Sequence, residues 1–398
     1  METATRPLAG LDSRQQATLL WAGLAIVLAG FDGSVLVLSL PAVAHDFGAK
    51  VSALANLGSV LALGSIGSLP LATLADHFGR RRLIAMAVAG FSIANFASGF
   101  AGSLLALTVL RLVAVCFEAL VGSVATALIV EEAPPGRRGQ AVSALSILSG
   151  AGLTLVVIAY PVVAPHWRWL FIAGGPGIVA APLIWRFLPE GRAWQRVHVS
   201  ASALRLLMQP PWLTRIGVLA ATTLVVALVL EPAGLLFTLY ASQTLHMSAA
   251  TISVVIVASG AVAFPAYIAG GFLSDRIGRR VPGVIFTGAY SLFAGLSFVS
   301  GAAGFVAGNV LWSAGASAAT PVMGAWSGEL YPTRARASAE ASTGVAGALG
   351  GIIGLQLVGL LSGGLGLGGA IALAGVVGTL GGVLLLALPE TRGRPLPD

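Results

Sequence analysis

Long apolar runs, each bounded by short charged clusters, leave this chain few ways to fold in water. A transmembrane helix needs about 20 consecutive apolar residues, and twelve such runs occur. They comprise residues 17–41, 52–75, 83–102, 104–130, 141–163, 169–188, 215–240, 250–273, 283–302, 305–328, 340–361 and 368–388. The runs lack the alternating pattern of membrane-barrel strands. The sequence therefore predicts an all-α membrane protein with twelve transmembrane helices.

The small number of charges argues against several classes of water-soluble protein. Charged residues make up 9% of the 398 residues, whereas ordinary soluble domains carry about 25%. A soluble fold cannot bury so large an apolar fraction, because most of its surface must stay hydrated. Soluble enzymes and secreted disulfide-linked domains fit this composition poorly, and the single cysteine, Cys116, excludes an intrachain disulfide.

Basic residues predict how the spans are oriented. The chain has 22 basic residues. Nineteen of them lie near the N-terminus, in the C-terminal tail, or in the connections that follow spans 2, 4, 6, 8 and 10 and at the adjoining helix ends. Lys50 and Arg168 lie in connections on the other side, and Arg111 lies within a span. Because basic residues concentrate in cytoplasmic loops, we expect both termini and the 189–214 connection on the cytoplasmic side of an inner membrane. The net charge of +7 is then a topology signal, and no nucleic-acid partner is expected.

Three short charged motifs occur twice, about half a chain apart. They pair residues 76–81 with 275–280, 131–138 with 329–336, and 188–192 with 388–392. Their shifts of 199, 198 and 200 residues predict two six-helix halves related by a pseudo-twofold axis, 1–188 and 215–398, joined by a cytoplasmic linker, 189–214. The second half ends in a short cytoplasmic tail. Parallel repeats of this kind are one arrangement found in transporters, with the substrate site between the halves.

The repeated motifs resemble those of the major facilitator superfamily of transporters, and the resemblance covers the whole chain. Asp-x-x-Gly-Arg-Arg at 76–81 and 275–280 is similar to the signature loop of that family. Glu-x-x-Pro-x-x-x-Arg at 131–138 and 329–336, followed in each half by Pro-Glu, resembles the sugar-porter branch and its metabolite, aromatic-acid and organic-cation relatives. The resemblance implies alternating access to a central site.

The same resemblance implies that the repeated charged residues form a cytoplasmic gate that does not touch substrate. The gate candidates are Asp76, Arg80, Arg81, Glu131, Arg138, Glu190, Asp275, Arg279, Arg280, Glu329, Arg336 and Glu390. Their charges can pair across the inner face, and the aspartates suit a helix N-terminus. The alternative is that the basic loops only fix topology, but topology alone needs no acidic partners at fixed spacing.

Four ionisable residues lie within predicted spans, where they are costly and point to function. Arg111 and Glu118 are seven positions apart and share one helix face. By resemblance to proton-coupled sugar porters, Asp32 carries the proton and Arg111 is its partner. Burial favours a neutral carboxyl and a nearby guanidinium favours a charged one, so movement of Arg111 would switch proton binding. Glu118 is a further candidate for proton coupling or substrate binding. The alternatives are a static Asp32–Arg111 pair and a Glu118 that only neutralises Arg111.

The fourth residue, Glu231, precedes Pro232, which interrupts the helical hydrogen bonds beside a carboxylate. Such breaks are typical of helices that line cavities, although a hinge is the alternative. The candidate substrate-binding residues are Arg111, Glu231, Tyr240, Asn309, Trp312, Gln356, Asn56 and Tyr160. Apart from the two charged residues, residues of these types are more often packing or interfacial residues than ligands.

These residues predict a secondary transporter that couples protons to a small polar organic solute by symport. The resemblance implies that all four ionisable groups could face a central cavity, and one base with up to three acids there disfavours a multiply anionic substrate. Proton-coupled efflux of drugs or metabolites is the nearest alternative, and a membrane sensor that binds solute without moving it is more remote. The sequence contains no metal-ligand cluster and no nucleophile–base arrangement, so we expect no metal, no cofactor and no enzyme activity. We expect the chain to function as a monomer in the lipid bilayer.

Overall fold

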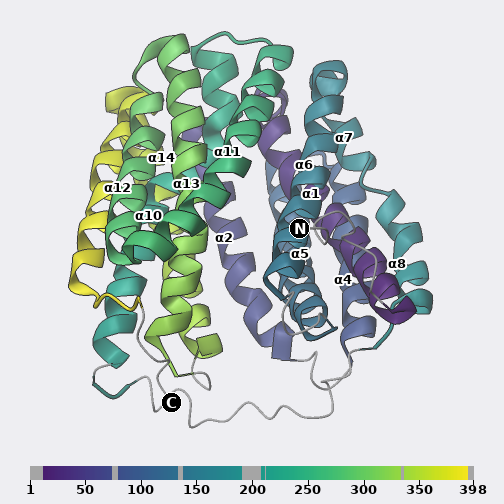
Figure 1. Ribbon diagram of the computed structural model, residues 1–398. Helices are drawn as coiled ribbons and strands as arrows, with labels where there is room; N and C mark the ends of the chain where they lie inside the picture. Colours follow the sequence, from purple (N-terminus) through teal and green to yellow (C-terminus); the bar gives the residue numbers. More distant parts are fainter. Residues whose placement is uncertain are drawn as a thin grey trace. The chain divides into compact units, whose positions relative to one another are not determined.

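The computed structural model describes residues 12–73, 79–132, 138–190, 208–210, 212–332 and 336–392. All regular secondary structure in these ranges is helical, and no strand occurs among them (Figure 1). The predicted all-α fold class is therefore confirmed.

The helices of the N-terminal part follow the predicted apolar runs closely. They are α1 Ser13–Asp46, α2 Val51–Thr73, α4 Arg80–Ser98, α5 Leu104–Glu132, α6 Arg138–Val163, α7 Arg168–Ile172 and α8 Pro176–Phe187, with a 3₁₀ turn at Ala164–His166. The run 169–188 differs from the expectation of one helix, because a turn at 173–175 divides it into α7 and α8. Pro176 explains the break, since it has no N–H to donate to the preceding turn and therefore suits the first position of a new helix.

The helices of the C-terminal part are α10 Trp212–Leu239, α11 Ala249–Ile277, α12 Arg280–Ser297, α13 Gly301–Leu330 and α14 Arg336–Leu384. A π-helical turn, Tyr240–Thr244, extends α10, and a 3₁₀ turn, Leu385–Ala387, ends α14. The 49 residues of α14 contain Gly366, whose φ of 69° and ψ of 164° are not helical. Gly366 therefore separates two helices that correspond to the predicted runs 340–361 and 368–388.

Within the described ranges, seven helical segments are long and apolar enough to cross a membrane. They are Ser13–Asp46, Leu104–Thr126, Ile147–His166, Arg168–Phe187, Trp212–Thr244, Ala249–Ile277 and Ala339–Ala387. Because lipid offers no hydrogen-bond partners, a helix that satisfies its own backbone is the expected spanning element. The count of twelve spans stays a prediction.

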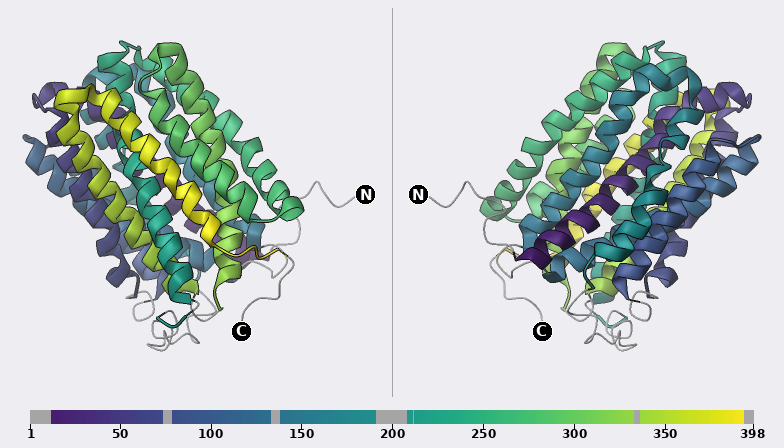
Figure 2. Two further views of the ribbon diagram at one scale, coloured as in Figure 1. Left: turned by 90° about the vertical axis from the view of Figure 1, so that its left-hand side faces the viewer. Right: turned by 90° about the vertical axis from the view of Figure 1, so that its right-hand side faces the viewer.

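The chain forms two compact units. One comprises Met1–Ser39 and Gly67–His198, and the other comprises Leu40–Ile66 and Val199–Asp398. The helices of each unit can be followed from two further directions in Figure 2. Residues 51–66 of α2 therefore group with the second unit, whereas the sequence repeat places them in the first half. The two six-helix halves and the 189–214 linker stay predictions.

Each unit has its own apolar core. In the first unit, α1, α4, α5, α6 and α8 contribute buried residues such as Ile84, Phe91 and Val121. In the second unit, Trp326, Leu330 and neighbouring residues form a cluster near the ends of α13 and α14. These cores hold the helices that carry the charged residues described next.

Candidate functional site

Three charged side chains meet in the interior of the first unit. Arg111 of α5 is 1% exposed, and its Nη1 lies 3.0 Å from Oδ2 of Asp32 on α1. Its Nη2 donates to Oε1 of Glu118 at 3.0 Å and to the backbone oxygen of Asp32 at 3.3 Å. The fold therefore brings together the three residues that the sequence singles out for proton coupling.

The charges of this cluster do not balance when all three groups are ionised. One guanidinium faces two carboxylates, so the cluster carries a net charge of −1 in a region where Asp32 is also 1% exposed. An uncompensated buried charge is costly even after relaxation. A single bound proton would remove that net charge.

A fourth side chain, which the sequence reasoning did not single out, completes the cluster. Oδ1 of Asn95 on α4 accepts a hydrogen bond from Arg111 Nη1 at 3.0 Å. The ring of Phe171 on α7 lies 5.8 Å from the guanidinium carbon, within the range of cation–π attraction. Asn95 carries no charge, and its position in an apolar run gave only the weak signal of a polar amide within a span.

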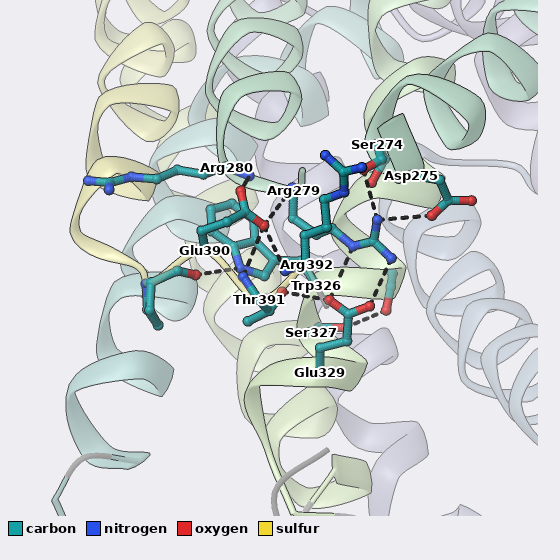
Figure 3. Close-up of polar contacts among 12 residues, drawn as sticks. Ser274, Asp275, Arg279, Arg280, Trp326, Ser327, Glu329, Glu390, Thr391 and Arg392 are labelled. Carbon is teal, nitrogen blue, oxygen red and sulfur yellow. Dashed lines mark hydrogen bonds and ion pairs between the residues drawn. The ribbon is translucent and has the colours of Figure 1, made fainter. Parts of the chain in front are cut away.

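The gate candidates of the second unit whose side chains the structure describes form a connected network (Figure 3). Arg279 donates through Nε and Nη2 to the two carboxylate oxygens of Glu329, at 3.1 and 2.9 Å. Its Nη1 donates to Oδ1 of Asp275 at 2.9 Å. Paired hydrogen bonds of this kind fix both partners in orientation. The hydrogen bond with Glu329 is the main reason that the pKa of Arg279 is raised above its usual value.

Glu390 occupies the N-terminus of α12 in the same network (Figure 3). Its carboxylate accepts from the backbone N–H groups of Arg279 and Arg280, both at 2.9 Å. A helix N-terminus favours an anion. Burial alone would raise the pKa of Glu390, but hydrogen bonds from four backbone N–H groups outweigh it and lower that pKa below its ordinary value.

Glycine makes this approach possible. Gly278, the residue before Arg279, has a φ of 102°, a conformation that other residues rarely adopt. A Cβ atom there would lie 2.5 Å from Oε2 of Glu390. Glycine at this place in the signature loop therefore serves both the backbone turn and the close carboxylate.

The first unit repeats the arrangement. Oε1 of Glu190 accepts from the backbone N–H groups of Arg80 and Arg81, at 2.6 and 3.2 Å, at the start of α4. Gly79 has a φ of 85°, and a Cβ atom there would lie 3.0 Å from Glu190. The repeated motifs thus make equivalent contacts, each within its own unit. These acceptor contacts go to backbone N–H groups, whereas the sequence suggested pairing with arginine side chains across the inner face, which stays a prediction.

Four gate candidates are not placed. Asp76 lies outside the described residues, and so do the side chains of Glu131, Arg138 and Arg336. Their predicted roles are therefore untested. The next residue after Glu131, Glu132, is described, and its Oε1 lies 3.5 Å from Nη2 of Arg14 on α1.

The candidate substrate residues are dispersed. Tyr240 is buried, and its hydroxyl donates to the backbone oxygen of Phe298. Asn309 is buried and accepts from Ser259 at 2.6 Å. Tyr160 is buried as well. These hydrogen bonds account for Tyr240 and Asn309 by packing within a unit, and Tyr160 is known only to be buried. The fold therefore offers no direct support for contact of these three residues with solute.

The remaining candidates lie on less buried positions. Trp312 is half-buried, and Glu231 is exposed, with its Cγ beside Gly351 of α14. Gln356 of α14 donates through Nε2 to Oδ1 of Asn56 on α2, at 2.9 Å, and to Oγ of Ser59 at the same distance. Gln356 and Asn56 are therefore the uncharged candidates that the fold joins directly, within the second unit.

Comparison with known proteins identifies the family and the fold. A model of the Major Facilitator Superfamily matches residues 22–231 and 219–398. A crystal structure of a D-xylose–proton symporter has a TM-score of 0.77 at 20% sequence identity and covers 96% of this chain and 100% of that one. At that identity the likeness concerns the fold alone.

Two relatives of known name differ in function: one is named as a drug-resistance protein and the other as a transporter of an aromatic acid. The puromycin resistance protein of Streptomyces alboniger is 32% identical over 181 residues, which cover 43% of this chain and 36% of that protein. The gallate transporter of Pseudomonas putida is 29% identical over 189 residues, which cover 45% and 42%. The match thus spans less than half the length of either relative. With the family model covering both parts of the chain, this protein belongs to the major facilitator superfamily of membrane transporters.

Proposed function

We propose that this chain is a proton-coupled secondary transporter that takes up a small polar organic solute by symport. The observation that carries the proposal is the buried Arg111, which holds the carboxylates of Asp32 and Glu118 at once. Two acids on one base form a group that gains a proton without leaving a net charge. Such a group is able to couple proton binding to a change of conformation.

The proposed coupling is electrostatic. With both carboxylates charged, Arg111 is held by Asp32 and Glu118. A proton taken from the outer side neutralises one acid and weakens its hold on the guanidinium. The transporter then changes to its inward-open state while the cluster carries no net charge. Water on the cytoplasmic side accepts the proton. In this scheme the networks around Glu190 and Glu390 control opening to the cytoplasm.

A small aromatic monocarboxylate is the first substrate class to test. The similarity to a gallate transporter supports this choice, and the few basic residues of the interior disfavour multiply charged anions. Glu231, exposed on α10 before Pro232, is the candidate that we place nearest the solute in the second unit. Asn309, Trp312, Gln356, Asn56, Tyr160 and Tyr240 follow as the remaining candidates.

The first prediction concerns Asp32. We expect purified protein in liposomes to accumulate radiolabelled gallate when an inward proton gradient is imposed, and Asp32→Asn to abolish this accumulation while gallate exchange at equal pH continues. The amide cannot release a proton, but it keeps the size of the side chain. Ser98→Ala, which removes a buried hydroxyl that donates to the backbone oxygen of Ala94 within α4, is the control.

Accumulation by Asp32→Asn equal to that of the parent would contradict the proposal. Should gallate not be carried, the same liposomes with a trapped pH-sensitive dye report the solute class. Proton entry on addition of an aromatic acid, a sugar or an organic cation then identifies it. A parent that moves no protons with any class would also contradict symport.

Proton-coupled efflux is the second candidate, and the similarity to a puromycin resistance protein favours it. The discriminating measurement is direction. Cells that produce the parent, compared with cells that produce Asp32→Asn, should accumulate less puromycin only if the protein is an exporter. Equal puromycin levels together with gallate uptake would support symport.

A further inference from the structure

The side-chain amide of Asn95 is buried with one of its polar atoms unpaired in the described part of the chain. The residue is 0% exposed, and its Oδ1 accepts from Nη1 of Arg111 at 3.0 Å. Its Nδ2 is buried and has no hydrogen-bond partner within the described part of the chain. An unpaired buried donor destabilises a fold, so an apolar side chain would serve packing better. The reason for an amide here is therefore its contact with Arg111.

The backbone opposite Asn95 is shaped to admit it. A Cβ atom on Gly174, in the turn between α7 and α8, would lie 2.2 Å from Nδ2 of Asn95. Real side chains do not approach this closely, so residue 174 must lack one or Asn95 must move. The bare backbone of Gly174 thus lies beside Nδ2, and the amide oxygen faces the guanidinium.

Asn95 differs from the other side chains that accept hydrogen bonds from Arg111. The charged groups in contact with Arg111 are Asp32 from α1 and Glu118 from its own helix. α4 contributes Asn95 and α7 contributes the ring of Phe171, and neither titrates. A carboxylate that takes up a proton loses much of its attraction for a guanidinium, whereas an amide oxygen does not change.

We propose that Asn95 is a positioning residue of the Asp32–Arg111–Glu118 cluster, a neutral acceptor that keeps the guanidinium in place while a proton comes and goes, and that Gly174 makes room for it. The inference rests on the proposed proton coupling and deepens it. By sharing Arg111, Asn95 weakens the stabilisation of the two carboxylates in their charged forms. It therefore adjusts the pH at which the cluster binds its proton.

The test uses the melting temperature of the purified full-length protein in detergent, measured from about pH 4 to pH 9, and needs no solute. Asn95→Ala leaves Arg111 with Asp32 and Glu118 alone, which favours their charged forms, so the folded state binds fewer protons than the parent. By linkage, the melting temperature of Asn95→Ala relative to the parent should rise with pH. Asn95→Asp adds a third acid, and its relative melting temperature should fall with pH. Ser98→Ala, on the same helix, should show a constant difference.

A merely structural role predicts a loss of stability that does not depend on pH. The inference is overturned by a flat difference for Asn95→Ala, by a slope of the opposite sign, or by a slope that persists when Asp32→Asn and Glu118→Gln are also present. Should Asn95→Ala not fold, Gly174→Ala gives a second route, because its Cβ displaces Asn95 and should produce the same rising slope. Where Asn95→Ala does fold, adding it to Gly174→Ala should change the slope no further.

This outcome is separable from failure of the proposed function. If Asp32→Asn still accumulates solute, proton coupling through Asp32 is wrong, whatever the melting curves show. If Asp32→Asn abolishes accumulation but the slopes of the Asn95 variants are flat, the coupling stands and only the role of Asn95 is lost.

Discussion

At the scale of single residues, one arginine donates the hydrogen bonds that hold the buried polar groups of the first unit together. Arg111 satisfies two carboxylates, one amide oxygen and one backbone oxygen. Its planar guanidinium presents several donors in fixed directions, which an ammonium on a flexible stem cannot reproduce. A charge of the right sign is therefore not enough at this position.

Replacement of Arg111 tests this dependence. Arg111→Leu leaves two carboxyl groups buried without their base, and we expect a loss of about 3–5 kcal/mol in the free energy of unfolding at neutral pH. The loss should shrink as pH falls, because the two acids are then protonated. Arg111→Lys should lose less stability but still fail to support gradient-driven accumulation. Denaturation in detergent, followed at pH 5 and pH 7.5, measures the first effect; an equal loss at both pH values would contradict it.

At the scale of elements, the repeated motifs act through helix ends. Glu190 and Glu390 each accept hydrogen bonds from the first backbone N–H groups of an arginine pair about 110 residues earlier in the chain, at the starts of α4 and α12. These N–H groups have no partner within the helix. The carboxylate supplies one and adds a favourable interaction with the helix dipole. Arg215 similarly donates to the backbone oxygen of Leu330, at the end of α13.

The lowered pKa of Glu390 predicts how stability depends on pH. A carboxyl whose folded pKa is below its unfolded value stabilises the fold above about pH 4.3, the ordinary pKa of glutamate, and this stabilisation is lost as pH falls through the folded pKa. The melting temperature of the parent should therefore exceed that of Glu390→Gln by a constant amount above about pH 5, and the gap should narrow in more acidic buffer. Glu340→Gln, on an exposed position of α14, is the matched control. A gap that widens on acidification would show that Glu390 is not stabilised as an anion.

At the scale of the whole molecule, the repeat and the basic residues predict twelve spans with both termini in the cytoplasm. Six spans before the 189–214 connection would place Met208 on the inner side and Lys50 on the outer side. Cys116→Ala removes the single native cysteine, so new cysteines can be placed one at a time. Both positions are exposed in the fold.

In intact cells, Lys50→Cys should react with a membrane-impermeant maleimide, and Met208→Cys should react only after permeabilisation. The physical reason is the concentration of basic residues in cytoplasmic loops. A cysteine introduced at His246, in the connection after the π-helical turn, should behave like that at residue 50. Labelling of position 208 from outside would contradict the predicted number of spans or their orientation.

The sequence alone determined the fold class, the family and the charged residues worth attention. Lipid leaves a backbone no partner but itself, so long apolar runs must form helices, and each ionisable residue within them needs a reason. Composition and motif spacing are therefore enough to identify the helices and the ionisable residues within them. The spacing of Arg111 and Glu118 also indicated a shared helix face.

The tertiary structure decided which partners those residues have. Membrane helices are apolar on most sides, so the periodicity that marks a buried face in soluble proteins is absent. Nothing in the sequence around Asn95 or Gly174 indicated that an amide and a bare backbone would meet beside Arg111. Likewise, the packing of Tyr240 against Phe298 follows from close contact between helices distant in the chain. Such contacts depend on side-chain shape and helix approach, which only the folded chain specifies.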